Sequence, residues 1–373
     1  MTRSGQPVAP MRASTLEIDR AAIAANTRRF VRSTSAAIMA VVKSDAYGHG
    51  LAIVARTALA SGATWIGVTS LAEGIAVRAA GISMEVPVLS WLNPVELDVA
   101  TAVQLRIDLA VPSVRHLEAI AAARSRARVH LHLDTGMARD GAAPEEWRAL
   151  MAAAKRAEAD GLIEVVGVMG HLPLAATPDH PANERGQCAF LRGVELAGQA
   201  GLRPVVRHLA ATAATLTIPM THFDLVRIGA GLVGIDPSCT TRLRGVMRLT
   251  TPVVQVRRVA AGVGVGYGHS HITTRATTLA LLPIGYADGI PRCASGRAHV
   301  LVGGRRRPVI GEISMDQMIV DVGVDPVAPG DVAVVFGPGD DREPTVADWA
   351  RWAGTIPHEI VTGIGPRVGR RVI

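Results

Sequence analysis

The chain has 373 residues, of which 49% are hydrophobic and 19% charged, and its net charge is +7. This length exceeds one ordinary domain, and the composition can fill a large core and excludes a disordered chain. Aromatic residues make up only 3% and the basic residues are scattered, which argues against a nucleic-acid-binding surface. The sequence has no run of about 18 uncharged apolar residues, so we expect no membrane span.

The three cysteines, Cys188, Cys239 and Cys293, are widely spaced and odd in number. Such a set predicts neither a disulfide framework nor a metal site, and it fits a reducing compartment. Residues 1–12 resemble a loose leader, and Met1 to Ser14 lack the apolar segment of a secretory signal. We therefore expect a cytoplasmic protein without a metal centre.

The first two thirds of the chain alternate between short apolar runs and alanine-rich helical patterns. Ser14 to Ile18 predicts a short strand, and Asp19 is placed to cap a helix that reaches Phe30. The helical patterns that follow include Val114–Ala127, Glu145–Ala159 and Ala189–Ala200. Eight apolar runs are expected to be strands: Ile38–Val42, Thr64–Val68, Val86–Leu89, Ile107–Val111, Val129–Leu133, Ile163–Met169, Pro204–Leu209 and Phe223–Ile228.

Eight strands separated by helices predict an α/β fold of the (β/α)₈ TIM-barrel type, for which about 250 residues are typical. A doubly wound sheet is the alternative, and the count of eight favours the closed barrel. After about residue 240 the pattern becomes mostly β. Its expected strands are Val246–Val259, Thr277–Leu282, Ala298–Val302, Pro308–Ile313, Met318–Val322 and Asp331–Phe336.

A helix over Val346–Ala353, announced by Thr345, completes the second part of the chain. We therefore predict a barrel over residues 1–245 and a mostly β C-terminal domain over residues 246–373. Residues 1–18, with the first short strand, are expected to pack on the second domain.

One lysine stands out because it ends a buried strand. Lys43 follows the run Ile38–Val42, and Lys155 is the only other lysine in the chain. Burial of an amine is unfavourable, lowers its pKa and leaves a neutral nucleophile able to form a Schiff base. From the strand and the lysine alone, a lysine that merely extends past the strand end is an equally good interpretation.

Other polar residues also lie at strand ends, where barrel enzymes carry their chemistry. The loops after the seventh and eighth strands, Ala210–Ala213 and Gly229–Gly231, have the usual position of a phosphate site. The Thr212 hydroxyl, backbone amides and two glycines suit a phosphate group there. The remaining polar groups at strand ends are Asp134 to Arg139, His171, His208 and Arg227.

The stretch Ala40–Gly50, AVVKSDAYGHG, closely resembles the cofactor-lysine motif of the alanine racemases. Gly264–His269, GVGYGH, is similar to the catalytic tyrosine loop of that family. The resemblance runs from about residue 14 to the end of the chain. Further segments that match are Leu133–Arg139, Gly170–Leu172, Arg207–Ala210, Asp224–Gly229, Pro283–Gly289, Ile313–Gln317 and Gly354–Ile360.

This resemblance implies pyridoxal phosphate (PLP) bound covalently to Lys43, with Lys43 and Tyr267 as bases on opposite faces of the substrate. It further implies that His171 tunes the tyrosine base. The cofactor-binding residues that it implies are Tyr47, His171, His208, Thr212, Arg227, Gly229, Ala230 and His358. The substrate-binding residues that it implies are Arg139 and Met315 at the carboxylate and Tyr286 at the entrance.

Arg227 has two interpretations. Within an apolar strand it is expected to form a structural ion pair or to serve the site. The family resemblance places it at the pyridine nitrogen, where a fixed cation disfavours protonation of the ring and makes it a weaker electron sink. Related barrel decarboxylases carry a carboxylate there, so Arg227 favours racemisation over decarboxylation.

The chain departs from the family pattern at a few positions. His132 stands where many members have a lysine, often carbamylated, and His358 stands where a tyrosine is common. Ala211-Thr212 replaces an Asn-Ser pair. These changes predict a somewhat altered pocket, and they leave racemisation of another small amino acid, such as serine, or a non-catalytic PLP carrier as alternatives. The resemblance also implies a head-to-tail homodimer in which Tyr267 and Met315 serve the other subunit's barrel.

Overall fold

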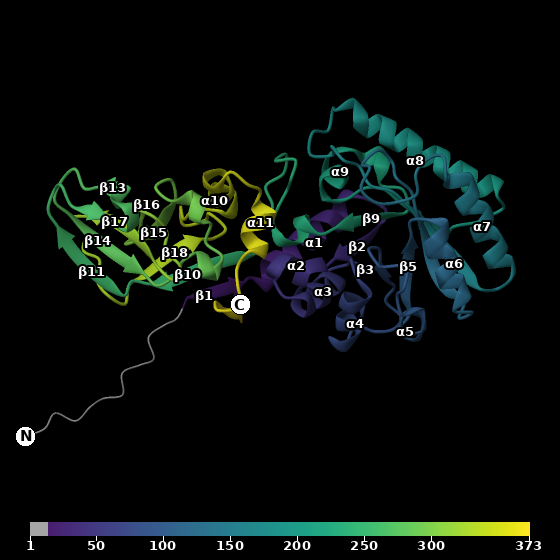
Figure 1. Cartoon of the computed structure of the whole chain (residues 1–373), viewed down its shortest axis with the longest axis horizontal. Coiled ribbons are helices and arrows are strands. Elements are labelled where there is room, and N and C mark those ends of the chain that lie inside the picture. Colours follow the sequence, from purple (N-terminus) through teal and green to yellow (C-terminus); the bar gives the residue numbers. More distant parts are fainter. Residues whose placement is uncertain (1–13) are drawn as a thin grey trace, which may run out of the picture. The chain divides into compact units, whose positions relative to one another are not determined.

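The computed structural model describes residues 14–373 and divides the chain into two compact units (Figure 1). One unit comprises Ile23–Leu243, and the other joins Arg244–Ile373 to the described residues that precede Ile23. The leader predicted for residues 1–12 lies outside the described residues.

The unit over Ile23–Leu243 contains an eight-stranded parallel sheet in the order β8-β7-β6-β5-β4-β3-β2-β9. The eight predicted strands and the predicted barrel fold are thereby confirmed, with ends shifted by a few residues. The strands are β2 (Ala37–Val41), β3 (Trp65–Val68), β4 (Val88–Ser90), β5 (Ile107–Val111), β6 (Ala127–His132), β7 (Ile163–Met169), β8 (Val206–His208) and β9 (Leu225–Ile228).

The barrel closes where β8 meets β9, the two ends of the strand order. The Asp224 N–H donates to the Arg207 carbonyl at 3.1 Å, and the Arg227 N–H donates to the Ala210 carbonyl at 3.0 Å. The Asp224 carboxylate also accepts from the Arg207 N–H at 2.8 Å and from its guanidinium at 2.7 and 3.0 Å. One aspartate therefore fixes the register at which the barrel closes.

Helices surround the strands of the barrel (Figure 1). Their starts follow the expected chemistry: the Asp19 carboxylate accepts from the Ala22 N–H at 2.9 Å, and Ser70 and Glu73 form a capping box. The helices are α1 (Arg20–Ser33), α2 (Lys43–Gly48), α3 (Leu51–Ala60), α4 (Leu71–Ala79), α5 (Val99–Gln104), α6 (Val114–Ala122), α7 (Trp147–Ala159), α8 (Pro181–Gln199) and α9 (Thr212–Thr217), with short 3₁₀ segments at η1 (Pro219–Thr221) and η2 (Ala230–Val233).

The prediction for α6 was wrong at its C-terminal end. The helix ends at Ala122 rather than Ala127, and Arg124 and Arg126 adopt φ values of 49° and 52°. These left-handed residues form the turn into β6, and the alanine-rich spacing that suggested a helix continues across that turn. Helix α8 differs in the other direction, because it begins at Pro181, eight residues before the predicted Ala189.

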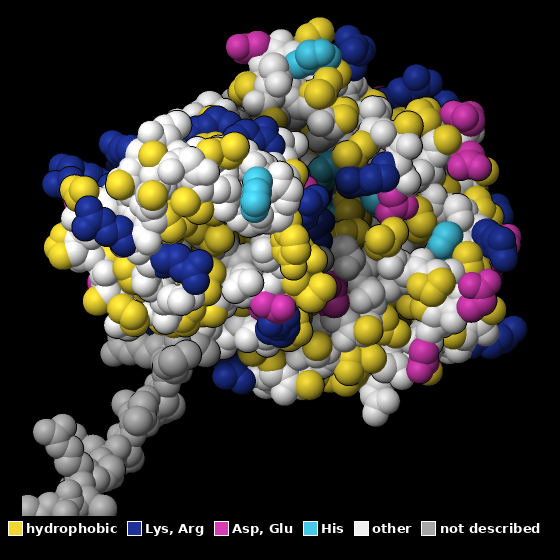
Figure 2. Space-filling model, turned by 60° about the vertical axis from the view of Figure 1, so that its left-hand side comes forward, with side chains coloured by type: hydrophobic (Ala, Val, Ile, Leu, Met, Phe, Trp, Pro, Cys, Tyr) yellow, Lys and Arg dark blue, Asp and Glu magenta, His cyan; other side chains and the backbone are white. Residues whose placement is uncertain are grey.

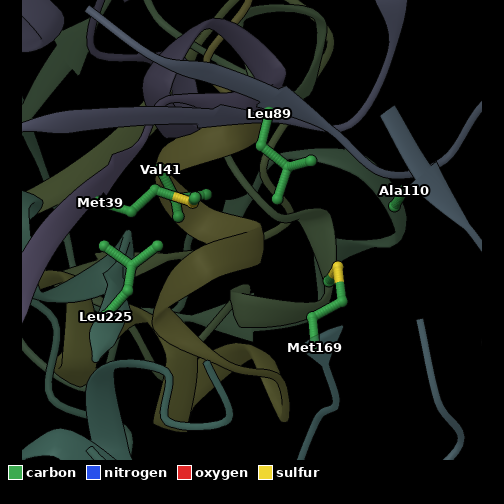
Figure 3. Close-up of a cluster of buried hydrophobic side chains, with 6 residues drawn as sticks. All are labelled: Met39, Val41, Leu89, Ala110, Met169 and Leu225. Carbon is green, nitrogen blue, oxygen red and sulfur yellow. The ribbon is translucent and has the colours of Figure 1, made fainter. Parts of the chain in front are cut away.

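The barrel bore is apolar on one side. Six side chains from β2, β4, β5, β7 and β9 pack there as one buried cluster (Figure 3): Met39, Val41, Leu89, Ala110, Met169 and Leu225. Full burial of a Leu or Met side chain contributes about 1.5–3 kcal/mol, so this cluster is a substantial part of the barrel's stability. It also fills the bore, as expected of a barrel of eight strands.

The second unit is built on a nine-stranded sheet in the order β11-β14-β17-β16-β15-β18-β10-β1-β19. Strand β1 (Thr15–Ile18) belongs to this sheet, antiparallel to β10 and parallel to β19. The other strands are β10 (Met247–Pro252), β11 (Gln255–Val259), β14 (Thr277–Leu282), β15 (His299–Val302), β16 (Arg305–Ile310), β17 (Met318–Gly323), β18 (Val332–Phe336) and β19 (Gly369–Val372), and a separate hairpin pairs β12 (Gly264–Val265) with β13 (His271–Ile272).

The run Val246–Val259, predicted as one strand, is two strands that lie six places apart in the sheet order. Only Val253 and Val254 join them, and these residues donate to the carbonyls of Asp331 and Leu281 at 2.8 and 2.9 Å. So short a connection requires the sheet to curl and bring β10 near β11. An unbroken apolar run does not reveal where a strand changes partners, which explains the error.

Two helices complete this unit, α10 (Val346–Ala353) and α11 (Pro357–Thr362). Thr345 and Asp348 form a capping box at α10, which confirms the predicted start. Short 3₁₀ segments lie at η3 (Tyr267–His269), η4 (Tyr286–Asp288) and η5 (Arg292–Ala294).

Two further observations concern membrane-spanning helices and the distribution of surface charge. Within residues 14–373, no helix combines the length and the apolarity that a bilayer crossing requires. Figure 2 shows Lys and Arg side chains spread over one face, interspersed with acidic and apolar ones rather than gathered into a single patch.

We expect Asp224→Ala to weaken the closure of the barrel. The substitution removes three hydrogen bonds to Arg207 and should lower the free energy of unfolding by about 1–2 kcal/mol. Urea unfolding followed by circular dichroism measures the loss. Glu118→Ala, at an exposed position of α6, is the control and should change stability by less than about 0.5 kcal/mol. Equal midpoints for the two variants would contradict this role.

Candidate active site

Lys43 follows β2 with one intervening residue and opens α2. Its side chain is half-buried. Burial lowers the pKa of the Lys43 amine, the positive charges of Arg139 and Arg227 act in the same direction, and Glu73 opposes them. A larger fraction of the amine is therefore neutral than in a solvated lysine, which supports a nucleophile rather than a lysine extending into solvent.

The turn after Lys43 is left-handed. Ser44, Asp45, Ala46 and Tyr47 all have φ between 52° and 59°, although such a conformation costs roughly 1–2 kcal/mol per residue. Two carboxylates stabilise it. Glu73 of α4 accepts from the Ser44 N–H at 2.6 Å, and Asp45 accepts from the Leu51 N–H at 2.7 Å. Strain held in this way is typical of functional sites.

The two loops predicted to bind phosphate lie side by side. The Gly231 N–H donates to the Thr212 hydroxyl at 3.2 Å. Tyr47 reaches the same place, because a Cβ at Gly229 would lie 2.3 Å from the Tyr47 hydroxyl. Burial raises the pKa of Tyr47 to about 12 against the effect of a hydrogen bond with the Ala230 backbone, so its hydroxyl stays protonated. Tyr47, Thr212, Gly229 and Ala230 are thus brought together.

Arg227 is 5% exposed and lies at the seam of the barrel. Its Nη1 donates to the His208 carbonyl at 2.9 Å and to His208 Nδ1 at 3.2 Å. Its Nη2 donates to the carbonyls of Gly170 and Leu209 at 2.7 and 3.0 Å and to His171 Nδ1 at 3.2 Å. All five acceptors are carbonyls or imidazoles, so among residues 14–373 no carboxylate forms an ion pair with the guanidinium.

Burial lowers the pKa of Arg227 to about 10, so it remains a cation at neutral pH. Within the described part of the chain, its Nε has no acceptor, and one N–H is left for a bound molecule.

The loop that carries Arg139 is shaped by Asp134. This carboxylate accepts from the N–H groups of Gly136, Met137 and Ala138 at 2.9, 2.8 and 3.2 Å. The next residue, Thr135, donates to the His171 carbonyl at 2.7 Å and accepts from the His171 N–H at 3.1 Å. The Arg139 loop is therefore tied to the loop after β7.

His132, where the chain departs from the family pattern, is buried with Nδ1 3.4 Å from the Asp140 carboxylate. Burial alone would raise the pKa of Asp140, but His132, the Gly141 N–H and the neighbouring Arg139 together outweigh it and lower that pKa. An anionic Asp140 therefore stands beside both His132 and Arg139.

Tyr267 of the second unit is 75% exposed, so it is not a core residue. It lies between Gly266 and Gly268, whose φ values are 69° and 65°.

Two other predicted residues of this unit are neighbours. The Tyr286 N–H donates to the Ser314 carbonyl at 3.0 Å, and the Ala287 N–H donates to the Met315 carbonyl at 2.9 Å. A Cβ at Gly285 would lie 2.2 Å from the Ser314 carbonyl oxygen, so only glycine permits this approach.

The predicted residues divide between the two units. Tyr267, Tyr286, Met315 and the half-buried His358 of α11 belong to the second unit. The barrel carries all the others: Lys43, Tyr47, Arg139, His171, His208, Thr212, Arg227, Gly229 and Ala230.

Sequence reasoning missed three polar residues of the barrel. One is Glu73, whose signal was the capping-box spacing from Ser70. The others are His130, which contacts His208, and Asp108, which contacts His130. The signal for His130 was the alternation Arg128-Val129-His130-Leu131-His132, which places polar side chains on one face of a buried strand, and that for Asp108 was a single carboxylate within the apolar run Ile107–Val111.

A desolvated lysine, a buried arginine and two adjoining loops, one with Thr212 and one with Gly229 and Gly231, lie at one end of a barrel and define an enzyme that works through a lysine amine. Comparisons with known proteins identify the family. The model for the alanine racemase N-terminal domain matches residues 18–237, and that for the alanine racemase C-terminal domain matches residues 246–372. The chain belongs to the alanine racemase family.

Individual relatives agree over the full length. The alanine racemase of Frankia casuarinae is 47% identical over 382 residues, which cover 100% of this chain and 99% of that protein. The solved structure of alanine racemase from Streptomyces coelicolor is 46% identical, with a TM-score of 0.94 and coverage of 97% and 98%. That of alanine racemase from Bartonella henselae, with covalently bound pyridoxal phosphate, is 28% identical, with a TM-score of 0.89 and coverage of 97% and 100%.

His171 should make stability depend on pH. Burial, followed by the charges of Arg227 and Arg139, lowers its pKa from 6.5 to about 3 in the folded protein. Below pH 6.5 the unfolded chain binds a proton that the folded protein does not, so stability falls as the pH falls. Between about pH 8 and pH 5 this single group accounts for a loss of about 2 kcal/mol.

Urea unfolding at both pH values measures this loss. In His171→Gln the difference in stability between pH 8 and pH 5 should shrink by that amount. The same difference in the variant and the wild type would contradict a neutral His171 in the folded protein.

Proposed function

We propose that this protein interconverts L-alanine and D-alanine with PLP as its cofactor. The observation that carries this proposal is the desolvated Lys43 amine at the catalytic end of a barrel whose chain matches alanine racemases along its whole length. The solved relative with covalently bound pyridoxal phosphate supports the choice of cofactor.

The residues of the barrel fit PLP. Lys43 supplies the amine for covalent attachment. The Tyr47 hydroxyl, Thr212 and the backbone at Gly229 and Ala230 would hold the phosphate, since glycine at position 229 is what lets Tyr47 approach. Arg227 would offer its remaining N–H to the ring nitrogen, and the fully buried His208 would act on the ring through Arg227.

When bound, PLP withdraws electrons from the substrate and acidifies the proton at its Cα. Lys43 takes or returns that proton on one face, because its amine has a lowered pKa. The Tyr267 phenol does so on the other face. Removal on one side and return on the other inverts the configuration. Arg139 orients the substrate carboxylate together with the Met315 amide, and Tyr286 borders the entrance.

The working molecule is a homodimer in which Tyr267 and Met315 serve the barrel of the other subunit. The exposed fractions of Tyr267 and Met315, 75% and 54%, support this arrangement, because both are available for contact with another chain. The compartment is the cytoplasm, and three exposed, unpaired cysteines agree with a reducing environment.

Lys43→Ala should abolish alanine racemisation and covalent attachment of PLP. The variant lacks the only amine at the strand end, and no other side chain there can replace it. Incubation with PLP, reduction with borohydride and mass spectrometry locate the attached group, and a chiral assay measures turnover.

Lys155→Ala is the matched control, since Lys155 on α7 is the only other lysine. It should keep both turnover and labelling. Labelling at Lys155 in the wild type, or turnover by Lys43→Ala, would refute the proposed function.

Subunits with complementary defects should restore one site. A mixed dimer of Lys43→Ala and Tyr267→Phe has one site with both residues intact and one with neither. With random assortment, co-expression should yield about one quarter of the wild-type rate. If mixed dimers form and show no recovery, then Lys43 and Tyr267 of a single subunit serve one site, and the shared-site arrangement is wrong.

A further inference from the structure

A continuous line of polar side chains crosses the bore of the barrel, and all but the outermost, Arg128, are buried. His208 Nδ1 lies 3.2 Å from Arg227 Nη1, and His208 Nε2 lies 2.9 Å from His130 Nδ1. His130 Nε2 lies 3.3 Å from Asp108 Oδ2, and Arg128 Nε donates to Asp108 Oδ1 at 2.8 Å. We call these five residues, Arg227, His208, His130, Asp108 and Arg128, the bore chain.

Between Arg227 and Asp108, the hydrogen bonds of the bore chain must all run in one direction, each with its donor on the Arg227 side. A guanidinium can only donate, so His208 Nδ1 must accept and the proton of His208 must be on Nε2. That N–H points at His130 Nδ1, which must then accept. The proton of His130 is therefore on Nε2, directed at the Asp108 carboxylate. Both imidazoles are neutral in this arrangement, and every contact is a proper hydrogen bond.

The charges at the two ends explain why the direction is favourable. Arg227 is a buried cation that no carboxylate of the described residues contacts, and Asp108 is a buried anion with 1% exposure. Burial would raise the pKa of Asp108, but its hydrogen bonds with His130 and Arg128 outweigh burial and keep that pKa low. Two imidazoles with aligned N–H bonds link the cation to the anion, and each bond polarises the next.

The surrounding residues hold His130 in one orientation. A Cβ at Gly167 of β7 would lie 2.3 Å from His130 Nδ1, so a glycine makes room for the ring. Trp65 of β3 contacts the other side of the ring edge to face, with centroids 5.7 Å apart. His130 and His208 are both fully buried, so water does not compete for their nitrogens.

We propose that His130 and Asp108 are positioning residues for the cofactor ring, an inference that rests on the proposed function. They fix the Nε2-protonated tautomer of His208, whose Nδ1 then accepts from Arg227 and orients the guanidinium. With Nη1 and Nη2 committed, Nε–H is the donor left for the ring nitrogen. If these hydrogen bonds ran in the opposite direction, a His208 N–H would face an Arg227 N–H, and the guanidinium would turn away.

The direct test is the tautomer of each histidine, observed by long-range ¹H–¹⁵N NMR correlation in the full-length protein with PLP bound and again without it. We expect His130 and His208 to carry their protons on Nε2 in both states. The signals of the two rings are assigned with variants in which one histidine at a time is replaced. A proton on Nδ1 of His208 in the wild type overturns the proposal without need of any variant.

Asp108→Asn tests the carboxylate that accepts the last hydrogen bond from His130. A carboxamide lacks the charge and can donate as well as accept, so the reversed arrangement, with the Arg227 guanidinium turned away, becomes accessible. We therefore expect His130 and His208 to become tautomer mixtures. The affinity for PLP should fall about tenfold, as for partners that orient functional histidines elsewhere. Glu164→Gln is the control. It removes only the outer contact of Arg128, at 3.2 Å, and should leave the tautomers and the affinity unchanged.

Asp108→Asn with unchanged tautomers and unchanged affinity overturns the proposal. The tautomer pattern of the protein without PLP does not depend on turnover. Failure of this inference is therefore distinguishable from failure of the proposed function, which the labelling of Lys43 decides.

Discussion

The hydrogen bonding of the Arg227 guanidinium is the constraint on which both the barrel and its site depend. A buried cation needs acceptors, and β7, β8 and their following loops supply three carbonyls and two imidazoles. These bonds join β9 to β8 and β7 at the place where the barrel closes. They also commit the two terminal nitrogens, so the remaining N–H has a defined direction. One side chain thus contributes both to the closure of the barrel and to the chemistry of the site.

The backbone of the site is strained, and other parts of the barrel stabilise it. Four left-handed residues follow Lys43; Glu73 of α4 accepts from the N–H of the first, Ser44, and Asp45 of the turn accepts from the Leu51 N–H. Gly229 gives Tyr47 access to the loop after β9, and Gly167 gives His130 its place in the bore. The apolar half of the bore supplies stability that these polar and strained features do not.

The sequence predicted the features that depend on local pattern. Apolar runs located all eight barrel strands, and Thr345 located the start of α10. Lys43 was recognisable because a lysine seldom ends a buried strand. The left-handed turn was not predictable, since Ser, Asp, Ala and Tyr carry no signal for it and Glu73 lies 29 residues away. The bore chain was missed for a similar reason. His130 contacts Asp108 and His208 only when the barrel closes and brings β5, β6 and β8 together.

The measurement that tests the account most directly is deuterium incorporation at Cα of L-alanine in D₂O, with the purified protein and PLP, while chirality is followed. Exchange on two faces by Lys43 and Tyr267 predicts D-alanine that carries deuterium at Cα, formed at the expense of L-alanine. L-alanine that acquires no deuterium and keeps its configuration, in a protein shown to bind PLP on Lys43, would contradict the account.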